Sequence, residues 1–310
     1  MKTVKAVLMN TGTKSALVVE GGGMRGIFAA GVLHAFGAEG FDPFDMYLGV
    51  SAGACNLASH LAGQNDRNYE IMVRYSSTSK FINFGRFVLG GHLMDLDWLW
   101  DITIREYRLD LEKIFRALSR PKKEFFIVAT SMDSGRALYL TPEKDTLEHY
   151  LKVSSSVPLL YRNILTVRSE KATDGGVADS IPVIEAFRRG ATEITVIRSR
   201  PSRYVKKDNR WSSIYDFLFR KYPNFANALK NRARVYRESV KFIRNPPANI
   251  TVIEIAPPDN LETNRVSRDL KALEAAYRTG IAQGSEHINR YDKTSSALMH
   301  KTKDRCQSCC

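Results

Sequence analysis

A serine flanked by glycines lies where a predicted strand meets a predicted helix. The segment Gly49-Val50-Ser51-Ala52-Gly53 follows the apolar run at 46–50 and precedes the Ala- and Leu-rich run at 52–61. Small neighbours allow a serine to occupy a sharp, strained turn from which its hydroxyl projects above a sheet. This pattern predicts a nucleophile elbow that Gly49 and Gly53 support, with Ser51 as the nucleophile of an acyl-transfer reaction.

A second glycine-rich segment, Gly21-Gly22-Gly23-Met24-Arg25-Gly26, lies between a predicted strand at 15–19 and a helical pattern at 27–36. Uncovered backbone N–H groups at a helix N-terminus bind phosphate or stabilise the oxyanion of a tetrahedral intermediate. Both interpretations are open from these residues; as an oxyanion hole, the segment would use Gly21, Gly22, Gly23 and Arg25, with Gly26 supporting the motif. Arg25 itself would be structural or help to place the oxyanion loop, and the alternative is a solvated cation at the start of the helix.

The same glycine run also satisfies G-x-G-x-x-G after a strand, the pattern of a dinucleotide site. Such a site requires an acidic residue at the end of the second strand, about 20 residues on, to hold a ribose. Here the second strand ends in Gly49-Val50-Ser51, and Asp42 and Asp45 lie before it. A Rossmann-like nucleotide-binding protein is therefore the alternative hypothesis, and no cofactor is expected under the preferred one.

A third motif, Asp174-Gly175-Gly176, follows a predicted strand at 164–167 and a turn-like stretch, and precedes a predicted helix at 182–189. Alone it is a common turn. Together and in this order, the three motifs resemble those of the patatin-like phospholipase family, above all its small bacterial members. The resemblance covers 14–189 and includes Ser154-Ser155-Ser156-Val157-Pro158, which is similar to the family's small-residue segment before a proline.

The resemblance implies a three-layer α/β/α sandwich and a serine lipid acyl hydrolase, a carboxylic ester hydrolase without metal or cofactor. Ser51 would attack the ester, Asp174 would take its proton, and N–H groups around Gly22 and Gly23 would bind the oxyanion. Gly175 and Gly176 would support Asp174. Phospholipids, lysophospholipids and simpler esters stay open as substrates. None of the six histidines lies in a family motif, so a histidine triad is less favoured, and the intact Ser51 and Asp174 disfavour a non-catalytic lipid-binding protein.

Strand and helix patterns alternate around these motifs. Further strands are predicted at 125–130, 137–140, 193–197 and 250–255, with helices at 147–154 and 261–291. This alternation predicts a mainly parallel sheet with helices on both faces. A shift in composition near Arg198 divides the chain into a catalytic core at 14–189 and a C-terminal α/β region at 190–295 that packs on it.

The charge distribution points to anionic partners, since the formal net charge is +13. No run reaches the roughly 18 to 20 apolar residues of a membrane span, and no signal peptide is visible, so a cytoplasmic protein is expected.

The basic region 198–244 mixes cations with aromatic residues, which suits an anionic membrane surface or single-stranded nucleic acid. For a lipid hydrolase we favour peripheral binding at the inner face of the membrane, with no nucleic acid; a solvated helical face is the alternative. The basic residues are Arg198, Arg200, Arg203, Lys206, Lys207 and Arg210, and the aromatic and apolar residues that follow them are Trp211, Ile214, Phe217 and Leu218.

The four cysteines do not form the spread-out framework of a disulfide-stapled domain. Cys55, one helical turn after Ser51, is predicted to pack in the core. Cys306, Cys309 and Cys310 crowd the end of the chain, and the segment 296–310 is predicted to be a flexible tail.

Overall fold

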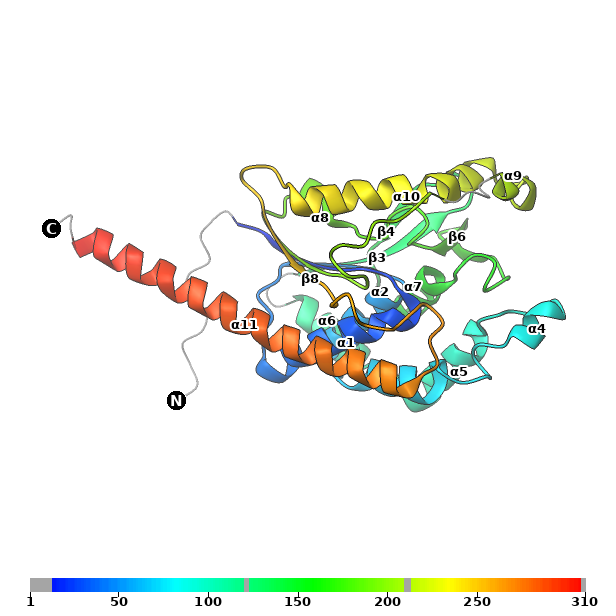
Figure 1. Cartoon of the computed structure of the whole chain (residues 1–310), viewed down its shortest axis with the longest axis horizontal. Coiled ribbons are helices and arrows are strands. Elements are labelled where there is room, and N and C mark those ends of the chain that lie inside the picture. Colours follow the sequence, from blue (N-terminus) through cyan, green and yellow to red (C-terminus); the bar gives the residue numbers. More distant parts are fainter. Residues whose placement is uncertain (1–12, 120–122, 209–212, 308–310) are drawn as a thin grey trace.

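The computed structural model describes residues 13–119, 123–208 and 213–307, with side chains described as far as 293. An eight-stranded sheet has the order β5-β6-β3-β2-β1-β7-β8, and β4 pairs with β3 outside this path (Figure 1). The pairs among β1, β2, β3, β7 and β8 are parallel, whereas β4 and β6 are antiparallel to β3. The strands are β1 (Ser15–Val19), β2 (Met46–Val50), β3 (Glu124–Ser131), β4 (Ala137–Leu140), β5 (Leu165–Val167), β6 (Glu170–Asp174), β7 (Glu193–Ile197) and β8 (Thr251–Ile255).

Helices cover both faces of this sheet, with α8 and α10 on one face and α1, α2 and α11 on the other (Figure 1). In the described part of the chain, no helix has both the length and the apolar composition needed to cross a membrane. The helices are α1 (Gly26–Glu39), α2 (Ala52–Leu61), α3 (Arg67–Ile71), α4 (Phe84–Val88), α5 (Leu96–Glu106), α6 (Leu111–Ser119), α7 (Leu147–Ser155), α8 (Val183–Arg188), α9 (Ile214–Leu218), α10 (Pro223–Arg244) and α11 (Leu270–Gln307).

The central strands are apolar throughout because both of their faces are buried. In β1, Leu17 and Val19 join the core cluster that includes α1 and α2, whereas Ala16 and Val18 join the cluster that includes α8 and α10. Successive side chains of a strand point to opposite faces, so one short run supplies two cores. The predicted three-layer α/β/α sandwich with a mainly parallel sheet is confirmed.

Two segments differ from the sequence prediction. The stretch before Asp174, predicted as turn-like, forms β6, which pairs antiparallel with both β5 and β3. The C-terminal helix begins at Leu270 instead of residue 261 and continues to Gln307, into the segment predicted as a flexible tail. Cys309 and Cys310 lie outside the described residues, as does the side chain of Cys306.

The region 190–295 contributes two strands to the same sheet as the region 14–189. β7 pairs with β1, and β8 pairs with β7 at the sheet edge. Arg198, which we placed in the basic surface, directly follows β7 and is fully buried, so that placement is wrong. Its guanidinium pairs with Glu20 at 3.0 Å and with Glu254, and donates to the Tyr236 hydroxyl at 2.8 Å. These partners compensate for the loss of water around a buried charge.

We expect Arg198→Met to lower the free energy of unfolding by about 3 to 5 kcal/mol, because it leaves the buried carboxylate of Glu20 without its partner. The shift in the urea unfolding midpoint measures this effect. Arg188→Met is the control, since the Arg188 side chain is 69% exposed on α8. Equal midpoints for the two variants would show that the buried pair contributes nothing.

Candidate active site

Ser51 lies at the turn between β2 and α2 and is 6% exposed. Its φ of 54° is in the left-handed region that non-glycine residues rarely adopt. The Ser51 backbone N–H donates to Ser154 Oγ at 2.8 Å, and that hydroxyl donates to the Val128 carbonyl at 2.6 Å. Ser154 therefore links the strained turn to β3.

Gly49 and Gly53 are required because the backbone passes very close to both. A Cβ atom on Gly49 would lie 2.5 Å from Ala54 Cα, and one on Gly53 would lie 2.5 Å from the Val19 carbonyl oxygen. Neither backbone neighbour can move without displacing a strand or the elbow helix. The motif needs glycine at these two positions because the turn packs directly against β1 and against the start of α2.

The glycine-rich loop lies beside this turn. A Cβ atom on Gly21 would be 3.3 Å from Ser51 Cβ, which places the loop against the candidate nucleophile. In the described part of the chain, no protein acceptor takes a hydrogen bond from the N–H of Gly22 or Gly23. Asn56 on the elbow helix donates to the Gly26 carbonyl at 2.8 Å and links the two motifs.

Asp174 reaches the same edge of the sheet from β6. Val50 pairs with Val128 and Asp174 pairs with Ala129, so Ser51 and Asp174 lie at one level on either side of β3. Two strand spacings put their Cα atoms roughly 10 Å apart. Asp174 Oδ1 accepts the Gly176 N–H at 2.8 Å. Between these two described side chains there is no hydrogen bond, and such contacts often tighten only when substrate binds.

The loop after Asp174 is held by residues distant in sequence. A Cβ atom on Gly175 would lie 2.1 Å from the Val128 carbonyl oxygen. Arg232 Nε on α10 donates to the Gly176 carbonyl at 2.6 Å. On the other loop, the Met24 N–H donates to the Arg265 carbonyl at 3.1 Å.

Three of these positioning contacts were missed by sequence reasoning. Nothing in the sequence pattern marks Arg232 or Arg265, because neither belongs to a motif. Ser154 lies in the small-residue segment before Pro158, and that segment was the available signal.

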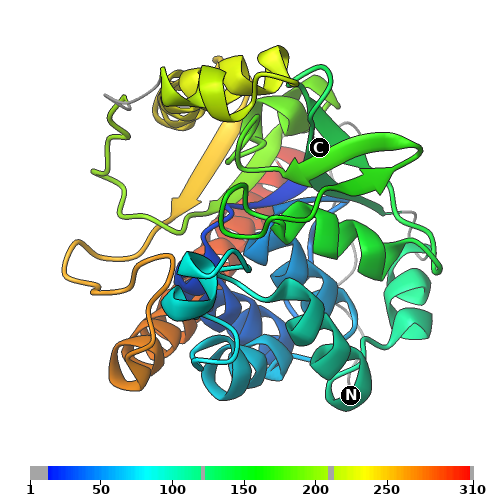
Figure 2. The ribbon, with the colours of Figure 1, turned by 90° about the vertical axis from the view of Figure 1, so that its right-hand side faces the viewer.

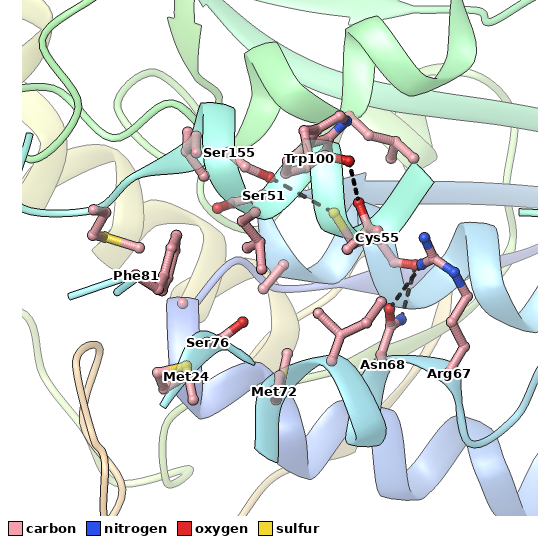
Figure 3. Close-up of a pocket in the computed structure, with 18 of the residues that line it drawn as sticks. Met24, Ser51, Cys55, Arg67, Asn68, Met72, Ser76, Phe81, Trp100 and Ser155 are labelled. Carbon is pink, nitrogen blue, oxygen red and sulfur yellow. Dashed lines mark hydrogen bonds between the residues drawn. The ribbon is translucent and has the colours of Figure 1, made fainter. Parts of the chain in front are cut away.

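Ser51 opens onto a cavity of about 110 Å³ between the elbow helix and the segment that carries α3 to α5. Figure 3 shows Met24, Met72 and Phe81 around it, with Cys55 and Ser155 on the side of Ser51. The volume is below the ~300 to 1,000 Å³ of most ligand pockets, and flexible methionine side chains can enlarge it. Among the described residues that line it, none is a histidine.

Cys55 lines this cavity and also packs against the core, as predicted. Burial raises the pKa of its thiol, so the neutral form predominates.

The Arg25 side chain does not line the cavity at Ser51 but faces a second cavity lined by Ser199 and Arg200. Within the described residues, no group of histidine, cysteine and acidic side chains has the arrangement of a metal site.

Residues 17–187 match the family model described as patatin-like phospholipase, which is more than half of the chain. The chain belongs to the patatin-like phospholipase family. Residues 222–295 of this patatin-like protein match a second model, a domain of unknown function called DUF6363. That model covers all of α10 and the first part of α11, and includes both Arg232 and Arg265.

Several proteins are similar to this patatin-like chain. The uncharacterized protein YjjU of Escherichia coli K12 is 36% identical over 274 residues, which cover 86% of this chain and 74% of YjjU. Lysophospholipase NTE1 of Kluyveromyces lactis is 26% identical, over 90% of this chain but 19% of its own length. The structure of human GIVD cytosolic phospholipase A2 aligns with a TM-score of 0.46 at 13% identity, covering 97% of this chain and 61% of that one.

Proposed function

We propose that this patatin-like protein is a serine lipid acyl hydrolase that cleaves acyl esters of phospholipids or lysophospholipids. The strained Ser51 turn, which opens onto a cavity with apolar walls, is the observation that carries the proposal. The lysophospholipase name of the yeast relatives supports a lipid ester as substrate.

In the proposed reaction, Ser51 Oγ attacks the ester carbonyl carbon while its proton passes to the Asp174 carboxylate. The uncommitted N–H groups of Gly22 and Gly23 are the candidates to stabilise the oxyanion. As the carbon–oxygen bond breaks, the leaving alcohol takes the proton from Asp174. Water, deprotonated by Asp174, then attacks the acyl-serine ester, and as the ester bond to Ser51 Oγ breaks, Asp174 returns the proton to this oxygen and the fatty acid is released.

The surroundings of Ser51 favour a dyad over a histidine triad. His34 contacts Tyr277 on α11, and the pKa of His60 is lowered by burial, which favours its neutral form. Neither lines the cavity at Ser51. These surroundings support a nucleotide-binding protein less well than a hydrolase, because the loop after β1 lies against Ser51 and β2 ends in the elbow instead of an acidic residue.

A panel of defined lipids tests the proposed activity. We expect purified protein to release fatty acid from lysophospholipids or phospholipids, with the products identified by mass spectrometry and Ser51→Ala protein as the blank. If no lipid ester in the panel is cleaved above that blank, the proposed activity is wrong.

We further propose that the protein is cytoplasmic and binds the inner face of the membrane peripherally. The helices α4 and α9 project from the same end of the molecule (Figures 1 and 2). Each carries exposed apolar side chains, with Leu89 directly after α4 88% exposed and Phe217 on α9 73% exposed. The short segment before α4 contributes Phe81 to the cavity at Ser51, so membrane contact here would bring lipid close to the site.

The basic segment before α9 supports this surface only in part. Lys207 is exposed, but the Lys206 ammonium group lies over the Tyr236 ring at 4.8 Å. Burial, followed by the charges of Arg232 and Arg265, lowers the pKa of Lys206 to about 6. The predicted contributors Arg210 and Trp211 lie outside the described residues.

We expect Phe217→Ser with Leu89→Ser to lower sedimentation with anionic vesicles by about tenfold, because each exposed apolar side chain contributes ~1.5 kcal/mol or more when buried in lipid. Turnover of a soluble short-chain ester should persist. Ile253→Thr, 40% exposed on the edge strand β8, is the control. Unchanged sedimentation would show that this end of the molecule is an ordinary solvated surface.

A further inference from the structure

The cavity at Ser51 extends to both sides of the nucleophile. In Figure 3, Phe81 lies on one side of Ser51, whereas Cys55 and, beyond it, Asn68 and Arg67 lie on the other. We call the part of the cavity from Ser51 to Arg67 the Arg67 arm. An acyl chain attached to Ser51 can enter the cavity in this direction.

The Arg67 arm follows one face of the elbow helix α2. Ser51, Cys55 and Ser59 are spaced by four residues, which places them one above the other along the helix. Ser51 and Cys55 line the cavity. Ser59 is 2% exposed and accepts a hydrogen bond from Arg67 Nη1 at 3.1 Å. The Arg67 guanidinium therefore lies at the end of the arm, about two helical turns from the nucleophile.

Two segments joined by hydrogen bonds form the end wall of the arm. Arg67 Nε donates to the Tyr107 carbonyl at 2.6 Å. Gln64 Nε2 donates to the Arg108 carbonyl at 3.0 Å, and Gln64 Oε1 accepts the Asp110 N–H at 3.1 Å. The start of α3 and the segment after α5 are thereby held together. Opening the wall would break these hydrogen bonds, which makes it costly.

The end wall is polar, unlike most of the cavity. Arg67 Nη1 also donates to Asn68 Oδ1 at 3.2 Å, and Glu148 contributes to the lining. Burial lowers the pKa of Arg67 to about 10, so its guanidinium is charged at neutral pH. Methylene groups are stabilised by leaving water for apolar surroundings, which a charged wall does not provide. An alkyl chain that displaced Arg67 would also leave its acceptors without a donor.

The length of the Arg67 arm sets a length for the acyl chain. The step of eight residues from Ser51 to Ser59 spans about 12 Å, at about 1.5 Å per residue. An extended alkyl chain advances about 1.25 Å per bond, given a carbon–carbon bond of about 1.5 Å and an angle of about 111°. A chain of about eight to ten carbons therefore fills the arm.

We infer that Arg67 limits the length of the acyl chain, so that the site prefers esters and lysophospholipids with acyl chains of about eight to ten carbons. This inference rests on the proposed hydrolase function and narrows its substrates by acyl length. Arg67 takes no part in the chemistry at Ser51. Its role is to decide which acyl chains are bound in full beside the nucleophile.

A series of saturated lysophosphatidylcholines that differ only in acyl length tests the inference. Hexanoyl, octanoyl, decanoyl, dodecanoyl and palmitoyl esters are presented at equal mole fractions in the same neutral detergent micelles. We expect kcat/KM to be highest for the octanoyl or decanoyl ester and about tenfold lower for the palmitoyl ester, whose distal methylenes find no apolar wall. A kcat/KM that is constant or rises up to palmitoyl would overturn the inference. That outcome is expected if long chains leave the cavity past Ile104, which is 40% exposed.

Arg67→Leu replaces the charged end of the arm by an apolar one. We expect the ratio of kcat/KM for the palmitoyl over the decanoyl ester to rise by about tenfold, because the arm can then receive about two further methylenes. The matched control is Arg74→Leu, which removes the same charge from the neighbouring helical turn, where the Arg74 side chain is 63% exposed. The control should keep the parent ratio. An equal rise in both variants, or an unchanged ratio in folded Arg67→Leu protein, would overturn the inference.

Cys55→Leu changes the arm in the opposite direction and keeps Arg67 with its partners. The larger side chain fills the middle of the arm, so we expect the preferred ester to shift from octanoyl or decanoyl to hexanoyl. Circular dichroism checks the fold of both variants. An unchanged profile of acyl length in folded Cys55→Leu protein would overturn the inference, even if Arg67→Leu protein does not fold.

Binding of fatty acids to Ser51→Ala protein gives a readout that needs no turnover. Trp100 lines the cavity, so its fluorescence reports on a bound chain. From octanoate to palmitate, below the concentrations at which micelles form, we expect affinity to rise up to decanoate and then to stop rising. Without an end wall, each added methylene would tighten binding by about fourfold. Tightening that continues to palmitate would overturn the inference. If the parent cleaves none of the esters, the hydrolase proposal fails, and this titration still decides whether the cavity limits the length of the chain.

Discussion

Ser51→Ala is expected to reduce ester hydrolysis by about four orders of magnitude or more, because removing a catalytic nucleophile leaves only binding and oxyanion stabilisation. The fold should be unchanged. Alanine keeps the Cβ atom that already occupies the turn at a φ of 54°, and the hydrogen bond to Ser154 uses the backbone N–H of residue 51.

Labelling with a fluorophosphonate probe tests the role of Ser51 as nucleophile without depending on the choice of substrate. The parent protein should be labelled at Ser51, as located by peptide mass spectrometry, and the alanine variant should not be labelled. Circular dichroism and the urea midpoint are the controls for folding. Labelling at another serine, or retained activity in a folded Ser51→Ala protein, would contradict the role of Ser51.

Asp174→Asn is expected to lower kcat by about two orders of magnitude or more, since the amide cannot accept the proton of Ser51. Asparagine has nearly the same shape as aspartate. Its Oδ1 can still accept the Gly176 N–H, and the Arg232 contact to the Gly176 carbonyl is independent of the side chain at 174. The loss should therefore appear in the rate and not in the urea midpoint.

Histidine variants supply the matched comparison for Asp174. His34→Gln, His92→Gln and His149→Gln change residues that lie outside the lining of the cavity at Ser51. Each variant should keep most of the parent kcat. A folded histidine variant that is as inactive as Asp174→Asn would show that a triad operates and that Asp174 is not the sole general base.

The sequence by itself determined the elements that carry the motifs. The strand at 46–50 and the elbow helix at 52–61 were predicted with the bounds that the structure shows, because apolar runs and small residues are local signals. The glycines were also readable from the motifs, and the structure supplies their physical reason, because a Cβ atom at Gly53 or Gly175 would collide with the backbone of a neighbouring strand. The α/β/α architecture followed from the alternation of strand and helix patterns.

Contacts across the sheet were decided only by the tertiary structure. The sequence of β6 carries no strong strand signal, and this strand forms because β3 and β5 pair with it. Arg198 reads as one cation in a basic run, yet its position after a central strand buries it between Glu20 and Glu254. The physical reason is shared: the environment of a polar side chain depends on partners far away in the chain, which no local pattern records.

The same reason explains the second cavity, which is lined by Arg25, Ser199 and Arg200. Arg25 belongs to a motif, but the carboxylate that could have paired with it, Glu20, is taken by Arg198, 178 residues further along the chain. Arg200 and Arg203 line the same cavity as Arg25 because β7 lies beside β1. The residue types and their spacing indicated an acyl hydrolase, and the packing of β7 and β8 against β1 decided where a positive charge is left without a partner.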